Sequence, residues 1–166
     1  MNPIEQAGTY RLPEAQLDRF LMKTSLGYPD HQSTMSILKS SGTKSGTKGL
    51  TALITTDAVV SMIDLAALVH GEDTVVDYIS RLVAATREAP EVQLGCSVRA
   101  GLGLMRASKV WAAASGRNYV TPDDIKSLAA PVLAHRMVLD PEEEFRGVTT
   151  EDVVQRILST EHAPQE

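Results

Sequence analysis

The feature that most limits the fold is a succession of apolar stretches whose side chains recur every three or four residues. The clearest covers residues 73–88, where Val76, Ile79 and Val83 follow this spacing and Pro90 ends the stretch. Such spacing gathers the apolar side chains on one face of a helix, and that face has to be buried against a neighbouring element. The chain after residue 55 is therefore predicted to form a bundle of amphipathic helices.

Capping residues mark where several of these helices begin and end. Ser97, Thr121 and Thr149 each precede an apolar stretch, and a hydroxyl at this position can accept a hydrogen bond from a free amide of the first turn. Gly116 is suited to end the helix that begins after Ser97. Pro131 stands inside the stretch that follows Thr121 and predicts a kink or a division there.

An earlier helix is predicted to begin at Thr55 or Thr56 and to end before Gly71. It carries five aliphatic side chains, namely Val59, Val60, Ile63, Leu65 and Leu68. Another short helix is predicted to begin at Asp30. Between the two, residues 40–54 include a near-duplicated SGTK tract without apolar side chains, which is typical of a flexible loop.

The start of the chain differs from the rest. Residues 13–20 predict a short helix, and residues 20–26 (FLMKTSL) predict a short strand. An isolated strand leaves its N–H and C=O groups unpaired. Residues 1–28 are therefore predicted to be part of a larger α/β domain, with a helical domain over residues 29–160 and a frayed tail over residues 161–166.

Composition excludes several classes of protein. The formal net charge of −5 argues against a broad nucleic-acid interface, which needs a basic face. The chain has no apolar run of the length that spans a membrane, and a single cysteine, Cys96, allows no internal disulfide. The absence of a signal-peptide pattern completes the expectation of a cytoplasmic protein.

Three segments, in this order and at this separation, resemble the MoxR family of AAA+ ATPases. They are residues 2–20 (NPIEQAGTYRLPEAQLDRF), 78–90 (YISRLVAATREAP) and 95–139, which begins GCSVRAGLG and ends LAHRMVL. The resemblance implies a mainly α fold, namely the C-terminal helical lid bundle of an AAA+ protein preceded by a short α/β remnant of the nucleotide-binding domain. It also implies use of ATP and Mg²⁺ by the intact protein.

The chain lacks the phosphate-binding loop and the Mg²⁺-binding acidic motif (Walker A and Walker B) that precede the matched segments in this family. The pattern G-x-x-x-x-G-K-[ST] has no match, and GTKSGTKG resembles it only in composition. The chain is therefore expected to be a C-terminal fragment that does not hydrolyse ATP on its own.

The resemblance assigns roles to three polar residues. Asn2 matches the sensor-1 position that orients the attacking water, although a loop Asn before proline also favours a turn. Arg19 matches the arginine finger, which reaches the nucleotide of a neighbouring subunit, with a surface ion pair to Glu14, Asp18 or another acid as the alternative. Arg99 matches sensor 2, which contacts the phosphates of its own subunit. A cation near a helix N-terminus opposes the helix dipole, so a nearby phosphate would explain Arg99.

Other residues are interpreted as structural. The four histidines are too scattered for a metal site, and the acidic run at residues 141–145 is interpreted as a solvated face. Leu104, Met105 and Trp111 are predicted to lie in the core. The pair His135–Arg136 is predicted to end a helix, where cations are favoured.

The function implied by the resemblance is a hexameric, ring-forming ATPase that remodels or matures partner proteins in a chaperone-like way. Proteins with von Willebrand factor A domains are the partners that the family suggests. The alternative is a freestanding helical module that binds another protein without nucleotide, in which Arg19 and Arg99 would be dispensable. DNA binding is disfavoured by the acidic balance and by the lack of a basic recognition helix.

Overall fold

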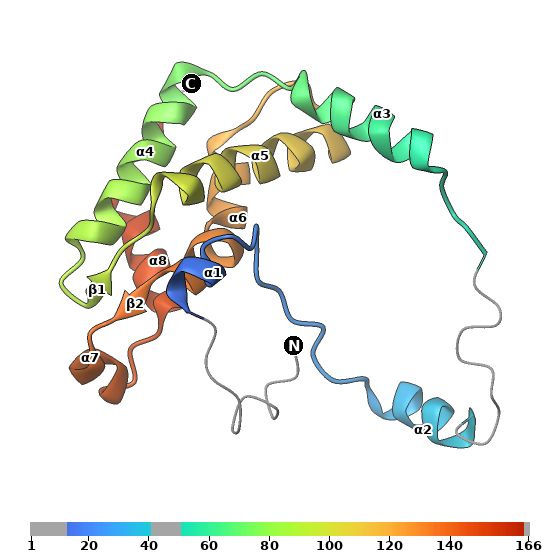
Figure 1. Cartoon of the computed structure of the whole chain (residues 1–166), viewed down its shortest axis with the longest axis horizontal. Helices are drawn as coiled ribbons and strands as arrows, with labels where there is room; N and C mark the ends of the chain where they lie inside the picture. The colour runs from blue at the N-terminus through green and yellow to red at the C-terminus, as the bar shows by residue number, and fades with distance from the viewer. Residues whose placement is uncertain (1–12, 41–50, 165–166) are drawn as a thin grey trace.

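Most of the described chain is helical, as Figure 1 shows, and one apolar core lies among the helices. The computed structural model describes residues 13–40 and 51–164. Along these residues the elements are α1 (Glu14–Leu17), α2 (His31–Ser40), α3 (Thr56–Ala67), α4 (Asp73–Glu88), β1 (Val92–Leu94), α5 (Val98–Ala114), α6 (Pro122–Leu133), the 3-10 helix η2 (Ala134–Arg136), β2 (Val138–Leu139), α7 (Pro141–Phe145) and α8 (Thr150–Thr160).

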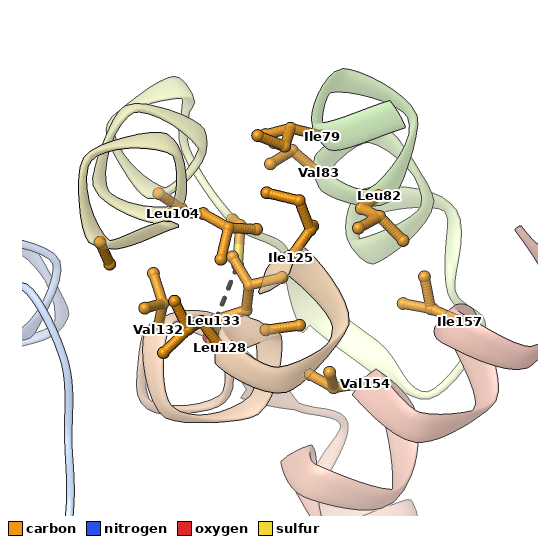
Figure 2. Packing of buried hydrophobic residues seen from close by; sticks show 14 of the residues in the cluster. Ile79, Leu82, Val83, Leu104, Ile125, Leu128, Val132, Leu133, Val154 and Ile157 are labelled. Carbon is orange, nitrogen blue, oxygen red and sulfur yellow. Dashed lines mark hydrogen bonds between the residues drawn. The ribbon is translucent and has the colours of Figure 1, made fainter. Parts of the chain in front are cut away.

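The core lies between α4, α5, α6 and α8. Leu82, Leu104 and Ile125 are 0% exposed, and Val154 is 2% exposed. Figure 2 shows such side chains from the four helices turned toward one another. The predicted helical bundle is confirmed. The spacing of apolar residues along each helix explains the packing, because it gives each helix one apolar face to bury.

The predicted caps are confirmed at two of three helices. Thr121 and Thr149 each accept a hydrogen bond from an amide three residues on, and the carboxylates of Asp124 and Asp152 each accept one from the cap amide. These are two complete capping boxes. Ser97 occupies the N-cap position of α5, but its side chain makes no cap hydrogen bond and donates to Asp18 instead.

The strand predicted over residues 20–26 is wrong. Residues 22–30 form neither helix nor strand, and Lys23 N, which donates to Pro131 O at 2.8 Å, attaches this segment to α6. The short sheet in the described part of the chain is instead the antiparallel pair β1–β2, which the sequence did not predict. Strands of two and three residues are too short to show an alternating pattern.

Pro131 neither breaks nor divides α6, which continues to Leu133 and then tightens into η2. The predicted division at the proline was therefore wrong, and the predicted kink stays a prediction. The missing amide of Pro131 costs α6 one hydrogen bond near its end. The carbonyl of the same residue accepts the bond from Lys23.

The helix predicted from Thr55 is α3, whose first turn Thr55 caps by accepting a hydrogen bond from Ala58 N at 3.1 Å. α3 packs on α5, yet its aliphatic residues remain largely exposed, with Ile63 at 62% and Leu68 at 81%. Trp111 on α5 is 51% exposed, so its predicted core position was wrong, whereas Leu104 is buried as predicted.

Helix α2 and the residues after α8 differ in how they are attached to the bundle. No residue of α2 is buried, and Figure 1 shows this helix away from the bundle. Beyond α8, Arg81 of α4 forms an ion pair with Glu161 at 2.7 Å and donates to His162 O at 2.9 Å. Residues 161–162, within the predicted tail, are thus attached to α4.

Candidate functional site

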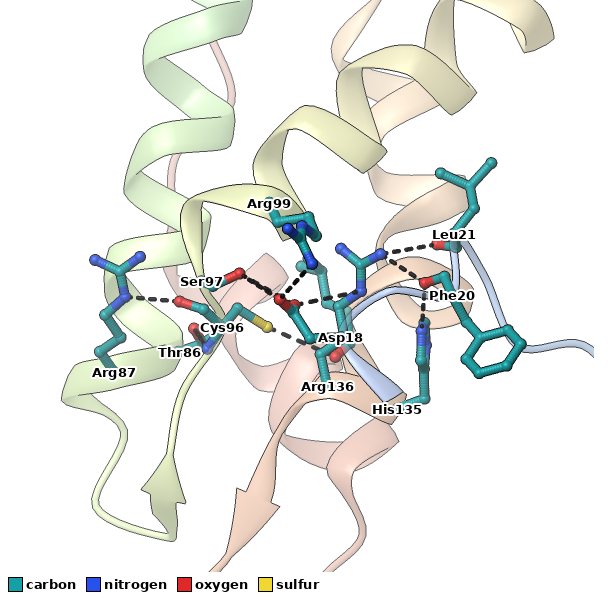
Figure 3. Close-up of polar contacts among 11 residues, drawn as sticks. Asp18, Phe20, Leu21, Thr86, Arg87, Cys96, Ser97, Arg99, His135 and Arg136 are labelled. Carbon is teal, nitrogen blue, oxygen red and sulfur yellow. Dashed lines mark hydrogen bonds and ion pairs between the residues drawn. The ribbon is translucent and has the colours of Figure 1, made fainter. Parts of the chain in front are cut away.

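A cluster of charged residues joins the segment after α1 to the helical bundle. At its centre is Asp18, whose two carboxylate oxygens both lie 3.0 Å from Ser97 Oγ and share its one hydroxyl proton. Arg99 Nη1 lies 3.9 Å from Asp18 Oδ2, and Arg136 Nε lies 4.0 Å from Asp18 Oδ1. Figure 3 shows both guanidinium groups directed at this one carboxylate.

Arg136 is the buried member of the cluster, with a side chain only 2% exposed. Its Nη2 donates to Phe20 O at 2.6 Å and to Leu21 O at 3.4 Å. Burial lowers the pKa of Arg136 and Asp18 opposes this effect, but a guanidinium stays charged in proteins. Two of its nitrogens, Nε and Nη1, have no hydrogen-bond partner among the described residues.

His135 reaches the same backbone carbonyl as Arg136. Its Nε2 lies 3.0 Å from Phe20 O. Burial lowers the pKa of His135, so the imidazole is neutral at pH 7, and the proton must be on Nε2 for the contact to be a hydrogen bond. Phe20 O therefore accepts from two side chains of η2.

The structure places two of the three predicted site residues. Arg99 stands in the first turn of α5 with a side chain 57% exposed, and Asp18 is the acid beside it. Arg19 follows Asp18, and its exposed side chain makes no hydrogen bond or ion pair with the described residues. Asn2 lies outside the described residues.

Asp18 and Arg136 were missed by sequence reasoning. The acid was treated only as one candidate surface partner of Arg19, and the arginine only as a helix-end cation. A weak signal existed, because charged residues adjacent to matched positions are candidates for holding them in place. Without the fold, nothing in the sequence pairs residues this far apart.

The cluster has more positive than negative charge. Arg99 and Arg136 face a single carboxylate, and the amides of the first turn of α5 add a partial positive charge. Within the part of the chain that the structure describes, Arg99 is held only by a long contact, and its side chain is open to solvent. The arrangement can therefore accept a further anion at Arg99 without first breaking a short hydrogen bond.

Cys96, beside this cluster, is unsuited to nucleophilic chemistry. It is 1% exposed, and burial raises the pKa of its thiol to about 11. The thiol is therefore protonated at neutral pH, whereas the thiolate is the reactive form. Its role in the structure is packing.

Two kinds of feature are absent from residues 13–40 and 51–164, a metal site and a membrane-spanning helix. No group of three or more His, Cys, Asp or Glu side chains there is arranged to hold a metal ion. No helix in the same residues is both long enough and apolar enough to cross a membrane.

Comparisons with known proteins match the two sides of this cluster. The family described as AAA lid domain matches residues 84–157, and the ATPase family associated with various cellular activities (AAA) matches residues 1–22. Arg99 and Arg136 fall in the first match, and Asp18 and Arg19 fall in the second.

Curated relatives extend the match over nearly the whole chain. The chain is 39% identical to the uncharacterized protein YeaC of Bacillus subtilis. The match covers 98% of this chain and 51% of YeaC. The chain is 36% identical to Chaperone MoxR1 of Mycobacterium tuberculosis over 99% of its length, which is 45% of that protein. The chain thus spans about half the length of these relatives.

A solved structure has the same fold. The crystal structure of a predicted ATPase from Cytophaga hutchinsonii superposes with a TM-score of 0.87 at 34% identity. The match covers 99% of this chain and 52% of that one.

Proposed function

Because the chain belongs to the MoxR family of AAA+ ATPases, we propose that it supplies the nucleotide-sensing lid of a ring-forming ATPase. Arg99 contacts the phosphates of ATP bound to its own subunit, as sensor 2. Arg19 is the finger that reaches the nucleotide of the next subunit, and Asn2 orients the attacking water. The intact protein works with ATP and Mg²⁺.

The observation that supports this function is the state of Arg99. Its guanidinium is more than half exposed, 3.9 Å from its nearest acid, and beside a buried second cation. A planar guanidinium suits phosphate oxygens geometrically, and an anion is favoured at the N-terminus of α5. These residues fit a phosphate group, which supplies the negative charge that the cluster lacks.

The work done by the intact protein is proposed at a coarser level. Remodelling or maturation of partner proteins is supported by the name of the relative Chaperone MoxR1. A hexameric ring, a cytoplasmic location and partners with von Willebrand factor A domains remain predictions from the family. The phosphate-binding loop has no match in the chain, so ATP turnover requires residues outside it.

The first experiment is to sequence the coding region upstream of Met1 in the source genome. An in-frame extension of about 150 residues, the usual size of such a domain, that carries a phosphate-binding loop would support the proposal. A stop codon immediately upstream would contradict it and favour the interaction module.

Arg99→Ala in that extended protein is expected to weaken ATP binding about tenfold, the effect of one lost hydrogen bond to a charged group. Titration with a fluorescent ATP analogue measures the dissociation constant. Arg106→Ala removes another exposed arginine from the same helix and is the matched control, with no expected change. Equal affinities of the Arg99→Ala variant and the unaltered protein would rule out the sensor-2 role.

The alternative function, protein binding without nucleotide, is favoured by one observation, the exposed aliphatic side chains of α3. Exposed apolar patches of this kind are typical of interaction surfaces. In that case Arg19→Ala and Arg99→Ala would leave partner binding unchanged. Loss of nucleotide binding in the Arg99→Ala variant would decide against this alternative.

A further inference from the structure

We infer that Arg136 is a positioning residue for Arg19. Its buried guanidinium holds the turn formed by residues 18–21 against α5 and η2, and so determines where Arg19 lies relative to the helical bundle. The role of Arg19 toward nucleotide rests on the proposed function. The attachment of the turn does not, and it can be tested without nucleotide.

The contacts of the turn enclose Arg19 on both sides. The carboxylate of the preceding residue, Asp18, accepts the hydroxyl proton of Ser97, whose Oγ lies 3.0 Å from both carboxylate oxygens. The following residue, Phe20, has its carbonyl bound by Arg136 at 2.6 Å and by His135 at 3.0 Å. Arg19 is exposed and contributes none of these side-chain contacts, so the backbone is fixed while its guanidinium has no partner among the described residues.

The packing around Arg136 indicates that this side chain serves to bind backbone carbonyls. A side chain used only to fill space would be apolar, because burying a guanidinium with two unpartnered nitrogens has a high desolvation cost. The two carbonyls and Asp18 offset part of that cost. A rigid, planar donor group is suited to binding two adjacent carbonyls at once.

Helix α5 packs closely against Arg136 and Leu21 at Gly103. At Gly103 a Cβ atom would lie 3.3 Å from Arg136 Nη1 and 3.4 Å from Leu21 Cδ1. The absence of a side chain there lets the guanidinium and Leu21 lie against the helix backbone. Three separate segments thus meet at this point: the turn, α5 and η2.

Limited proteolysis of the 166-residue chain tests this role, because trypsin cleaves after Arg19, within the held turn. Cleavage needs local opening of the turn, and its rate follows the population of the open form. Arg136→Met removes the donors and keeps the site apolar. We expect it to raise the rate of cleavage after Arg19 about tenfold, corresponding to one net hydrogen bond.

Cleavage after Arg106, inside α5, is the internal reference because it requires the bundle to open. The expected result is that this rate changes much less than the rate at Arg19. Arg87→Met is the matched control, since Arg87 also donates to a backbone carbonyl, Cys96 O at 2.7 Å, but lies outside the turn. It should leave cleavage after Arg19 unchanged.

Two results would overturn the inference. One is an unchanged rate after Arg19 in the Arg136→Met variant. The other is an equal rise after Arg19 and Arg106, which would mean that Arg136 only stabilises the bundle as a whole. Neither result depends on ATP, so failure here and failure of the Arg99 titration are distinguishable.

Discussion

Asp124→Ala is expected to lower the free energy of unfolding by about 3 kcal/mol, the lower end for breaking a buried ion pair. Asp124 is 4% exposed, and Arg117 binds both of its carboxylate oxygens at 2.7 and 2.8 Å. The same carboxylate accepts from Thr121 N at 2.8 Å and Thr121 Oγ1 at 2.9 Å. Alanine removes all four bonds, while the partly exposed Arg117 can recover water, which limits the loss.

Urea denaturation followed by circular dichroism measures this loss, and the chain provides its own control. Asp152 completes the same kind of capping box at α8, but its hydrogen bonds are exposed. Asp152→Ala should therefore destabilise much less than Asp124→Ala, since water replaces the lost bonds. Equal losses would show that burial and Arg117 add nothing to the cap.

The same carboxylate gives a dependence on pH. Burial raises the pKa of Asp124, but the hydrogen bonds from Arg117 and Thr121 outweigh it and lower the pKa below 3.8. A lowered folded pKa contributes stability that is fully present above the unfolded pKa and lost as pH falls through the folded value. Stability should thus decline more steeply below about pH 4 in the unaltered chain than in Asp124→Asn.

Ile125→Ala should lower the free energy of unfolding by about 3 kcal/mol, within the range for removing a large aliphatic side chain from a core. Ile125 is 0% exposed and lies where α4 and α6 face each other, as Figure 2 shows. Its removal leaves a cavity that close-packed neighbours fill only in part. Urea denaturation again gives the value. The slope of the free energy of unfolding against urea concentration should stay unchanged, which would show that only stability has altered.

Ile63→Ala is the matched control for this substitution. Ile63 is the same residue type on α3 but is 62% exposed, so its truncation should change stability by less than about 0.5 kcal/mol. A large loss at Ile63 would mean that α3 buries this side chain in solution, against some other surface. A small loss at Ile125 would contradict the core described here.

The bundle could be predicted from sequence because its signals are local. Helical spacing at Val76, Ile79 and Val83, and capping hydroxyls at Thr121 and Thr149, lie within one or two turns of what they specify. The predicted strand at residues 20–26 failed for the complementary reason. An apolar run becomes a strand only beside a partner strand, and the described residues provide none.

The candidate site was predictable only in part. The resemblance indicated Arg19 and Arg99 through their neighbours in the chain, and the role of each remains a proposal. Asp18 and Arg136 acquire their importance from a contact between residues far apart in sequence. Likewise, the exposure of Trp111 could not be predicted, because helical spacing indicates which side chains share a face and not which face is covered.

The order in which parts of this molecule fold follows from how far apart in sequence the contacting residues are. Phe20 and the guanidinium that binds its carbonyl are 116 residues apart, whereas the packing of α4 on α5 and of α5 on α6 joins successive helices. Contacts that close long loops form slowly, because the entropy of closure is lost before the contact stabilises the chain. The turn should thus dock last during folding, onto a finished bundle, and detach first on heating. Arg19 is in this way carried by a segment that can release while the helical bundle stays folded.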